Sequence, residues 1–222
     1  MTLDQFFPFW KELTPAQQET LTRFVTRRSV KKGTILHNGS EDCVGLFIVE
    51  EGQLRAYIVS EEGKEISLYR LLPWDMCLFS ASCMMNSIQF DVTVIAEQDS
   101  EILHIPTAVY QGMMKESASV ANFTNEIMAS RFSDVMWLMD QILYKRMDSR
   151  LAALLLEESQ LSQTSQLKLT HEAAARYLGS AREVITRMLK YFQTEGIVSL
   201  SRGGIAITDS EKLAALAKDS IR

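Results

Sequence analysis

The stretch LTHEAAARYLGSAREVITRML, residues 169–189, decides the fold of the C-terminal part of this chain. It holds two short helical patterns separated by Gly179, an arrangement that predicts a helix-turn-helix. Thr170 is expected to cap the first helix, with Glu172 near its positive end. After the second helix, residues 196–207 alternate apolar and polar around Gly203-Gly204. That pattern predicts a β-hairpin and therefore a winged form of the motif.

The second helix of this motif has two chemically distinct faces. At 100° per residue, its apolar arc holds Val184, Ile185, Met188, Leu189 and Phe192. The opposite arc offers groups that suit base edges, because Arg donates to guanine, Glu accepts from cytosine, and a Thr methyl contacts thymine. We therefore predict base contacts by Arg182, Glu183, Thr186 and Arg187, with Lys190 on the same arc.

Two other interpretations of this helix stay open from the sequence. An ordinary amphipathic surface helix would also carry solvated Arg and Glu side chains on one face. In addition, Ser180 and Glu183 fit the spacing of a capping box, in which Glu183 would close the helix end instead of contacting a base.

The charge distribution favours DNA binding by the C-terminal part alone. The chain has a net charge of −5, but residues 145–222 carry 12 Lys and Arg against 9 Asp and Glu. Phosphate contacts need a local basic surface rather than a basic protein. The predicted partner is double-stranded DNA, and the predicted phosphate contacts are Lys168, Arg176, Ser180, Lys190 and Arg202.

Length and composition indicate two modest domains, since the chain has 222 residues and is 46% hydrophobic. No run is long enough to cross a bilayer, and residues 1–8 lack the basic start of a signal peptide. The three cysteines do not make a disulfide framework. We therefore expect a cytoplasmic protein with no membrane partner.

The N-terminal half has the texture of an antiparallel β domain. Short β-type runs cover residues 33–36, 46–52, 53–59, 65–71, 90–96 and 101–105, with turn signals at Asn38-Gly39, Glu51-Gly52, Glu62-Gly63 and Pro73-Trp74. Many short strands at even spacing predict a sandwich, roll or barrel. A short helical flank is expected at about residues 10–26.

Helical patterns return after Pro106. We expect a short helix over Thr107–Met114, a long one from about Ser119 to Lys145, and a third over Leu151–Glu158 capped by Asp148 or Ser149. Along the long helix, Phe132, Val135, Met139 and Ile142 form an apolar stripe that predicts a dimer seam. The alternative is that part of this stripe packs on the protein's own β domain.

This order of elements resembles the CRP/FNR family of bacterial transcription regulators across essentially the whole chain. The matching motifs are residues 33–39, 47–52, 61–65, 150–152 and 179–189. The resemblance implies an α+β fold with an N-terminal antiparallel β-roll (a cupin-like double-stranded roll), a long dimerisation helix and a C-terminal winged helix-turn-helix. The implied boundaries are 1–106, 107–147 and 148–222. It also implies a homodimer that binds a pseudo-palindromic operator, with RNA polymerase as a partner.

One segment departs from the cyclic-nucleotide-binding members of that family. Those members carry a Gly-Glu pair and an Arg-Ser pair that hold the sugar and the cyclic phosphate. Here Leu78-Phe79 and Gln89-Phe90 stand at those places. Because a partly buried phosphate needs a cation and donors, cyclic AMP is not expected as the ligand.

The same segment predicts an apolar ligand pocket instead. Its candidate lining residues are Cys77, Leu78, Phe79, Cys83, Met84, Met85, Gln89 and Phe90. Such walls suit an apolar or aromatic small molecule, or a flat cofactor such as haem. The candidate haem ligands are Cys77, Cys83, His37, His104 and Met84, although His37 and His104 are expected to be structural.

Cys77 and Cys83 have two interpretations, as small buried hydrophobes or as a thiol switch. Their spacing matches no zinc signature, so no metal site is predicted. No cysteine precedes Cys43, so the mechanism of the family's iron–sulfur members does not carry over.

No enzyme is predicted, because the chain has no nucleophile–base pair and no phosphate-binding glycine loop. The alternative function is a thiol- or haem-based redox or gas sensor whose helix-turn-helix serves protein contacts. The sequence does not indicate the effector, the operator, or whether the protein activates or represses.

Overall fold

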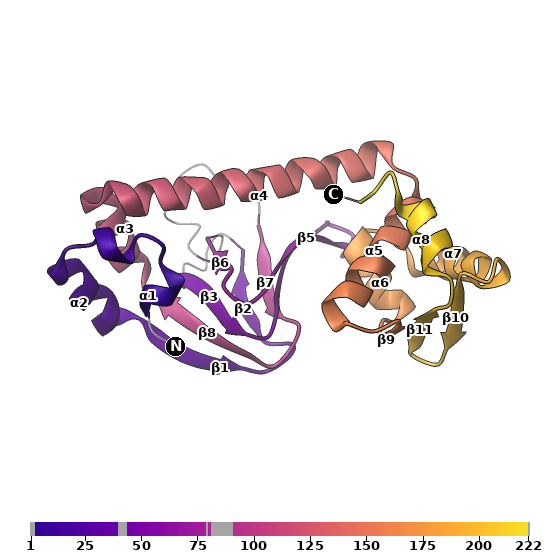
Figure 1. The fold of residues 1–222 in the computed structure, drawn as a ribbon, viewed down its shortest axis with the longest axis horizontal. Coiled ribbons are helices and arrows are strands. Elements are labelled where there is room, and N and C mark those ends of the chain that lie inside the picture. Colours follow the sequence, from indigo (N-terminus) through magenta and orange to yellow (C-terminus); the bar gives the residue numbers. More distant parts are fainter. Residues whose placement is uncertain (1–2, 40–43, 79, 81–90, 222) are drawn as a thin grey trace. The chain divides into compact units, whose positions relative to one another are not determined.

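The structure, a computed structural model, describes residues 3–39, 44–78, 80 and 91–221 (Figure 1). The chain divides into two compact units. The N-terminal unit comprises Met1–Val59 and Leu68–Val135, and the C-terminal unit comprises Ser60–Ser67 and Met136–Arg222. The division falls inside one long helix, which therefore contributes to both units.

Among the residues that the structure describes, the helical elements belonging wholly or partly to the N-terminal unit include α1 (Leu3–Phe6), a 3₁₀ turn (Trp10–Glu12), α2 (Pro15–Phe24), α3 (Thr107–Glu116) and α4 (Ala118–Tyr144). Thr14 caps α2 in a capping box, because its hydroxyl accepts from Gln17 N and the Gln17 side chain accepts from Thr14 N. The predicted short and long helices are confirmed as α3 and α4, within two residues at each end.

In its described residues the β domain has eight strands: β1 (Thr26–Val30), β2 (Ile35–Asn38), β3 (Leu46–Glu51), β4 (Leu54–Val59), β5 (Glu65–Leu71), β6 (Met76–Cys77), β7 (Thr93–Ala96) and β8 (Ser100–Ile105). They form two sheets, β1-β8-β3-β6 and β2-β7-β4-β5. The pairings of β1, β3 and β7 with their neighbours are antiparallel. The predicted antiparallel roll is confirmed.

Two strands of this β domain were missed from the sequence. β1 reads TRRSV and is exposed along most of its length, so it lacks the apolar alternation that marks a half-buried strand. The helical flank expected at residues 10–26 accordingly ends at Phe24. β6 has only two residues, which are too few for any pattern.

Strand β3 separates two hydrophobic clusters. Side chains alternate across a strand, so Leu46 and Ile48 pack against the helices, while Phe47 and Val49 point between the two sheets. The inter-sheet cluster also contains Leu54, Ala56, Leu71, Cys77, Val92, Val94, Ala96 and Ile102. Because β3 is buried on both faces, its sequence is a continuous apolar run rather than an alternating one.

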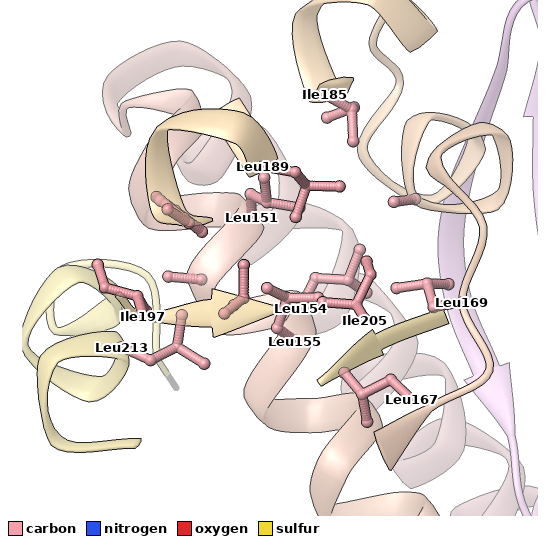
Figure 2. Close-up of a cluster of buried hydrophobic side chains, with 14 of the residues drawn as sticks. Leu151, Leu154, Leu155, Leu167, Leu169, Ile185, Leu189, Ile197, Ile205 and Leu213 are labelled. Atoms are coloured by element: carbon pink, nitrogen blue, oxygen red, sulfur yellow. The ribbon is translucent and has the colours of Figure 1, made fainter. Parts of the chain in front are cut away.

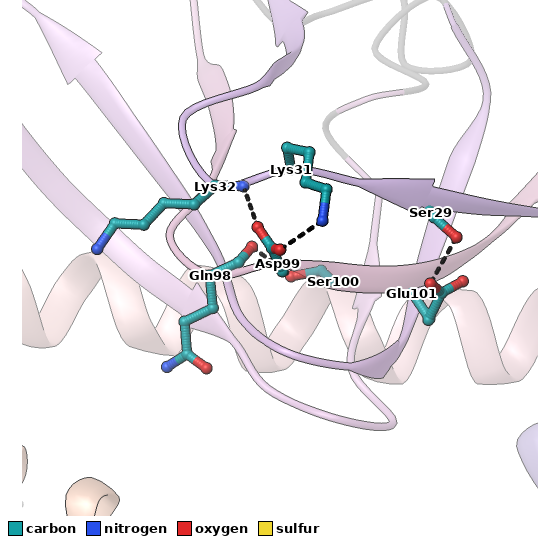
Figure 3. Close-up of polar contacts among 7 residues, drawn as sticks. All are labelled: Ser29, Lys31, Lys32, Gln98, Asp99, Ser100 and Glu101. Atoms are coloured by element: carbon teal, nitrogen blue, oxygen red, sulfur yellow. Dashed lines mark hydrogen bonds and ion pairs between the residues drawn. The ribbon is translucent and has the colours of Figure 1, made fainter.

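Polar side chains connect β1, the edge strand of its sheet, to its neighbour β8 (Figure 3). Asp99 accepts from Lys31 Nζ at 2.7 Å and from the Lys32 backbone N at 2.9 Å, and Ser29 Oγ donates to Glu101 Oε1 at 2.5 Å. The hydrogen bond from Lys31 is the main reason that the pKa of Asp99 lies below its ordinary value. These contacts hold the edge strand β1 to its neighbour β8.

The C-terminal unit contains α5 (Met147–Ser162), β9 (Gln166–Leu167), α6 (His171–Leu178), α7 (Arg182–Thr194), β10 (Val198–Ser201), β11 (Gly204–Ile207) and α8 (Ser210–Ala217). The strands form a sheet in the order β10-β11-β9. Its apolar core gathers side chains from every helix of this unit from α5 onward, including Leu151, Leu155, Ile185, Leu189 and Leu213 (Figure 2).

The predicted cap of α5 is wrong. The helix begins at Met147, four residues before the expected start, and Arg146 at the N-cap position makes no side-chain capping bond. Asp148 instead pairs with Arg146 at 2.6 Å, and the Ser149 hydroxyl is buried against Ser220 at 2.9 Å. Both residues are thus part of the first helical turn.

Helix α8 was not predicted from the sequence. It begins after Asp209, whose side chain accepts from Lys212 N at 2.9 Å. An acidic N-cap residue ahead of Leu213 was the available signal.

Candidate DNA interface

Capping and turn residues determine where α6 begins, where it ends and how the chain enters α7. Thr170 caps α6 by accepting from Ala173 N at 3.1 Å, as predicted. Gly179 then adopts a left-handed conformation, with φ 63° and ψ 36°, which a residue with a Cβ adopts only at a cost. The N–H groups of Gly179 and Ser180 both donate to the carbonyl of Ala175, so the chain turns sharply into α7.

The capping box considered for α7 is absent. The N-cap residue is Ala181, which makes no side-chain capping bond, and the helix begins at Arg182. Glu183 is therefore the second helical residue, whereas a capping box needs the acidic residue at the third position after a Ser or Thr cap. The alternative in which Glu183 closes the helix end is wrong.

Helix α7 divides into the two predicted faces. Ile185, Leu189 and Phe192 are buried in the core cluster, and Val184 and Met188 are half-buried at its margin. Arg182, Glu183, Arg187 and Lys190 are exposed on the other side. Three of the side chains predicted to contact bases, those of Arg182, Glu183 and Arg187, are therefore exposed, and all three lie in the first two turns of α7.

Thr186 differs from the other predicted base contacts. It is half-buried, and its hydroxyl lies 3.0 Å from Nδ1 of His171, the first residue of α6. The pKa of His171 is below its ordinary value, first because the ring is partly buried and then because Arg182 and Lys190 lie nearby. This bridge between the two helices was missed from the sequence.

The predicted phosphate contacts lie around this pair of helices. Lys168 is exposed just before α6, Arg176 is exposed on α6, and Arg202 is exposed in the turn of the β10–β11 hairpin. Ser180 is half-buried in the turn between α6 and α7. Every predicted DNA contact is therefore at least partly accessible and belongs to the C-terminal unit.

The wing is present, with a different turn from the one expected. Ser201 pairs with Gly204, so Gly204 is a strand residue and the two-residue turn is Arg202-Gly203. Gly203 has φ 82°, which fits such a turn. The turn places the Arg202 side chain at the tip of the hairpin.

Arg150 supports the turn from inside and was also missed. It is buried in α5, and its guanidinium donates to the carbonyl of Leu178 at 2.8 Å. Leu178 is the last residue of α6, where helix carbonyls have no partner within the helix. Arg150 thus satisfies the C-terminal end of α6 directly before Gly179.

Only part of the predicted ligand pocket can be placed. Cys77 is fully buried and Leu78 nearly so, whereas Phe79, Cys83, Met84, Met85, Gln89 and Phe90 lie outside the described residues. His37 is buried in β2, and His104 is buried in β8 with its ring bonded to the Val44 carbonyl and near Thr26. Within the described residues, no group of three or more His, Cys, Asp or Glu side chains could hold a metal ion.

An ion-pair cluster connects the β domain to α4. Arg131 on α4 lies 3.1 Å from Asp75 and 3.1 Å from Asp134, and its guanidinium sits over the ring of Tyr69. Burial is the main cause of a strongly raised pKa of Tyr69. Asp75 precedes β6, the strand that carries Cys77, so the cluster joins the predicted pocket segment to the long helix.

The predicted dimer seam is largely exposed. Phe132 is 68% exposed, Met139 is 46% exposed, and Ile142 is also exposed, whereas Val135 is half-buried. Met136 and Leu143, outside the set expected from the sequence, are exposed as well. Phe132, Met136, Met139 and Leu143 follow spacings of four, three and four, the repeat of a coiled-coil seam.

Among the described residues, no helix combines the length and the apolar side chains that spanning a membrane requires.

Two family models match most of this chain. The Crp-like helix-turn-helix domain matches residues 149–216, and the cyclic nucleotide-binding domain matches residues 27–117. These are the regions of the winged helix-turn-helix and of the β-roll.

Individual relatives agree with these matches. A crystal structure from Eubacterium rectale, described as a transcriptional regulator of the CRP/FNR family, is 56% identical. It has a TM-score of 0.94, over 96% of this chain and 99% of that one. The cyclic AMP receptor protein of Thermus thermophilus is 21% identical over 95% of this chain and 96% of its own length. The fumarate and nitrate reduction regulatory protein of Yersinia pestis is 26% identical over 86% of this chain and 78% of its own length.

Proposed function

Because the chain belongs to the CRP/FNR family of transcription regulators, we propose that it acts as a homodimer that binds a pseudo-palindromic operator through α7. The observation that carries the proposal is the division of α7 into a buried apolar face and an exposed face with Arg182, Glu183 and Arg187. Those side chains supply both donors and acceptors for base edges. RNA polymerase is the partner through which such a dimer would act.

The dimer is proposed to form through α4. A single α7 reads only one half-site, and a two-fold dimer reads two half-sites that lie about 34 Å apart, one turn of DNA. The exposed seam of Phe132, Met136, Met139 and Leu143 supports this arrangement, because large apolar side chains in a continuous stripe favour a partner helix.

The operator can be found by selection from random DNA. Full-length protein would be used to select duplexes from a random double-stranded library, and the bound fraction would be sequenced after several rounds. The expected result is an inverted repeat whose half-site centres are about 10 base pairs apart. Enrichment of no sequence, or of direct repeats only, would refute the proposal.

The signal is proposed to be an apolar ligand rather than a cyclic nucleotide. Cyclic-nucleotide-binding members of the family hold the phosphate with an Arg-Ser pair, and this chain has Gln89 and Phe90 there, which carry no positive charge. Where those members carry a Gly-Glu pair, this chain has Leu78, which is buried and apolar. Cys77 is fully buried, and thiol switches need accessible sulfur, which counts against the thiol alternative.

Calorimetry with cyclic AMP and spectroscopy of the purified protein test this part. We expect no heat of cyclic AMP binding and no change in affinity for the selected duplex when cyclic AMP is added. A haem would show in the absorption spectrum, and another bound molecule would appear as a mass difference between native and denatured protein. Micromolar binding of cyclic AMP would contradict the pocket argument.

A further inference from the structure

The bridge between His171 and Thr186 joins the two helices at the proposed DNA surface. His171 is the first residue of α6, and Thr186 lies in the second turn of α7. Nδ1 of the imidazole and Oγ1 of the threonine are 3.0 Å apart, and both side chains are half-buried. The second ring nitrogen, Nε2, takes no part in this contact.

The protonation state of the ring decides what Thr186 can do. When the ring is neutral and its proton is on Nε2, the Thr186 hydroxyl donates its only proton to Nδ1. When the ring is protonated, Nδ1–H donates to Thr186 Oγ1 instead. The hydroxyl proton is then free to donate elsewhere, and Nε2–H remains available to an acceptor.

The charges around His171 favour the neutral ring in the free protein. The positive groups Arg182 and Lys190 of α7 both act against protonation, and partial burial acts in the same direction. Glu172 follows His171 on α6 and is exposed. DNA phosphates would change this balance in favour of the protonated ring. The DNA backbone that approaches His171 would also neutralise the positive charges of Arg182 and Lys190.

We propose that His171 is a proton-linked DNA contact. On binding, the imidazole takes one proton from solvent, donates from Nε2–H to a phosphate oxygen and from Nδ1–H to Thr186, and releases the Thr186 hydroxyl to donate to a base. The inference rests on the DNA-binding function proposed above and adds a role for two specific side chains in it. His171 is a binding residue, and through it the orientation of Thr186 becomes dependent on pH.

The first consequence is that affinity for DNA falls as the pH rises. Binding that takes up a proton is favoured by acid, with a limit of about tenfold in the association constant per pH unit for one group. The association constant should change with pH mainly between two pKa values of His171. One is its pKa in the free protein, which is lowered from the ordinary value of 6.5, and the other is its higher pKa in the complex with DNA. The second consequence is that the salt dependence is steeper at low pH by about 1.8 in log K against log [salt] for the dimer, because each of its two protomers neutralises one more phosphate and each phosphate contributes about 0.9.

The experiment is a titration of fluorescent 30-base-pair duplexes with full-length protein at pH 5.5, 6.5, 7.5 and 8.5, each at four salt concentrations. One duplex carries the selected operator and the other a scrambled sequence of the same composition. Wild type should bind both more tightly at low pH. Calorimetry in buffers of different ionisation enthalpy should record the uptake of a fraction of a proton per protomer at pH 7.

Two substitutions of the histidine separate its charge from its shape. His171→Gln cannot titrate in this range and should give a flat pH profile with no proton uptake. His171→Lys carries a fixed charge and should show the steep salt dependence of acidic wild type at every pH. Far-UV circular dichroism of each variant shows whether it is folded, so that the two variants act as independent tests.

Thr186→Val is the control for the base contact. It removes the hydroxyl while keeping the side-chain volume, and should lose discrimination at one base pair in each half-site but keep the pH dependence on the scrambled duplex. A flat pH profile for wild type, or an unchanged slope in folded His171→Gln, would overturn the inference. Failure to select any operator would count against the proposed function instead, because the scrambled duplex still measures the His171 contact.

Discussion

At the scale of single residues, two arginines on α7 are expected to carry sequence recognition. Arg182→Ala and Arg187→Ala should each cost about 1–3 kcal/mol on the selected operator, because a bidentate contact to guanine is lost, and much less on scrambled DNA. Competition binding with both duplexes measures the difference. The matched control is Lys218→Ala, another exposed cation of the C-terminal unit, which should leave both affinities unchanged. Equal losses on both duplexes would mean that the two arginines contact phosphates.

Two glycines should respond in opposite directions to the same substitution. Gly179 has a positive φ at the end of α6, so Gly179→Ala should destabilise the protein by about 1–2 kcal/mol. Gly112 lies inside α3 with open space around it, so Gly112→Ala should stabilise by about 0.5–1 kcal/mol. Chemical denaturation of both variants tests this. The same sign for both would show that helix-end geometry does not govern the response.

At the scale of elements, helices α3 and α4 are joined by a buried hydrogen bond. Thr124 already donates to the Val120 carbonyl at 2.8 Å, so Tyr110 must donate to Thr124, 2.9 Å away. Tyr110→Phe removes one buried donor and should cost about 0.5–1.5 kcal/mol. Thr124→Val leaves the tyrosine hydroxyl buried without its partner and should cost more, about 1–3 kcal/mol. Urea denaturation of the two variants should therefore rank Thr124→Val as the less stable, and the reverse order would contradict this assignment of donor and acceptor.

The same tyrosine makes stability depend on alkaline pH. Burial raises its pKa to about 12 in the folded protein, above the ordinary value near 10. A raised folded-state pKa means that the contribution of Tyr110 is complete below about pH 10 and is lost as the pH rises toward 12. The stability advantage of wild type over Tyr110→Phe should shrink across that range.

How far the sequence predicts this molecule also differs between elements. The helix-turn-helix could be predicted because Thr170, Gly179 and the apolar period of α7 all act locally. Strand β1 could not be predicted, because it is exposed and has no apolar alternation of its own. It forms through its pairing with β8, which is far away in the sequence. The contacts of His171 with Thr186 and of Arg150 with Leu178 join residues 15 and 28 positions apart, and no local periodicity encodes them.

At the scale of the whole molecule, the exposed stripe on α4 predicts the oligomeric state. Phe132→Glu places like charges opposite each other in the proposed seam and should give monomers with weak operator binding. Because Phe132 is 68% exposed, the change should leave the protomer folded. Ser130→Glu adds the same charge at an exposed position off the stripe and should remain dimeric. Analytical ultracentrifugation distinguishes the two, and a dimeric Phe132→Glu protein would place the interface elsewhere.

The boundary between the two units has a mechanical consequence, because it falls within α4 between Val135 and Met136. The helix contains no glycine or proline, so nothing in its sequence relaxes torsion along its length of about 40 Å. One inserted residue would turn everything beyond it by about 100°, whereas seven would bring the helix back to within about 20° of its original phase. Communication along α4 should therefore depend on angular phase more than on distance, and tolerance to insertions should recur with the helical period.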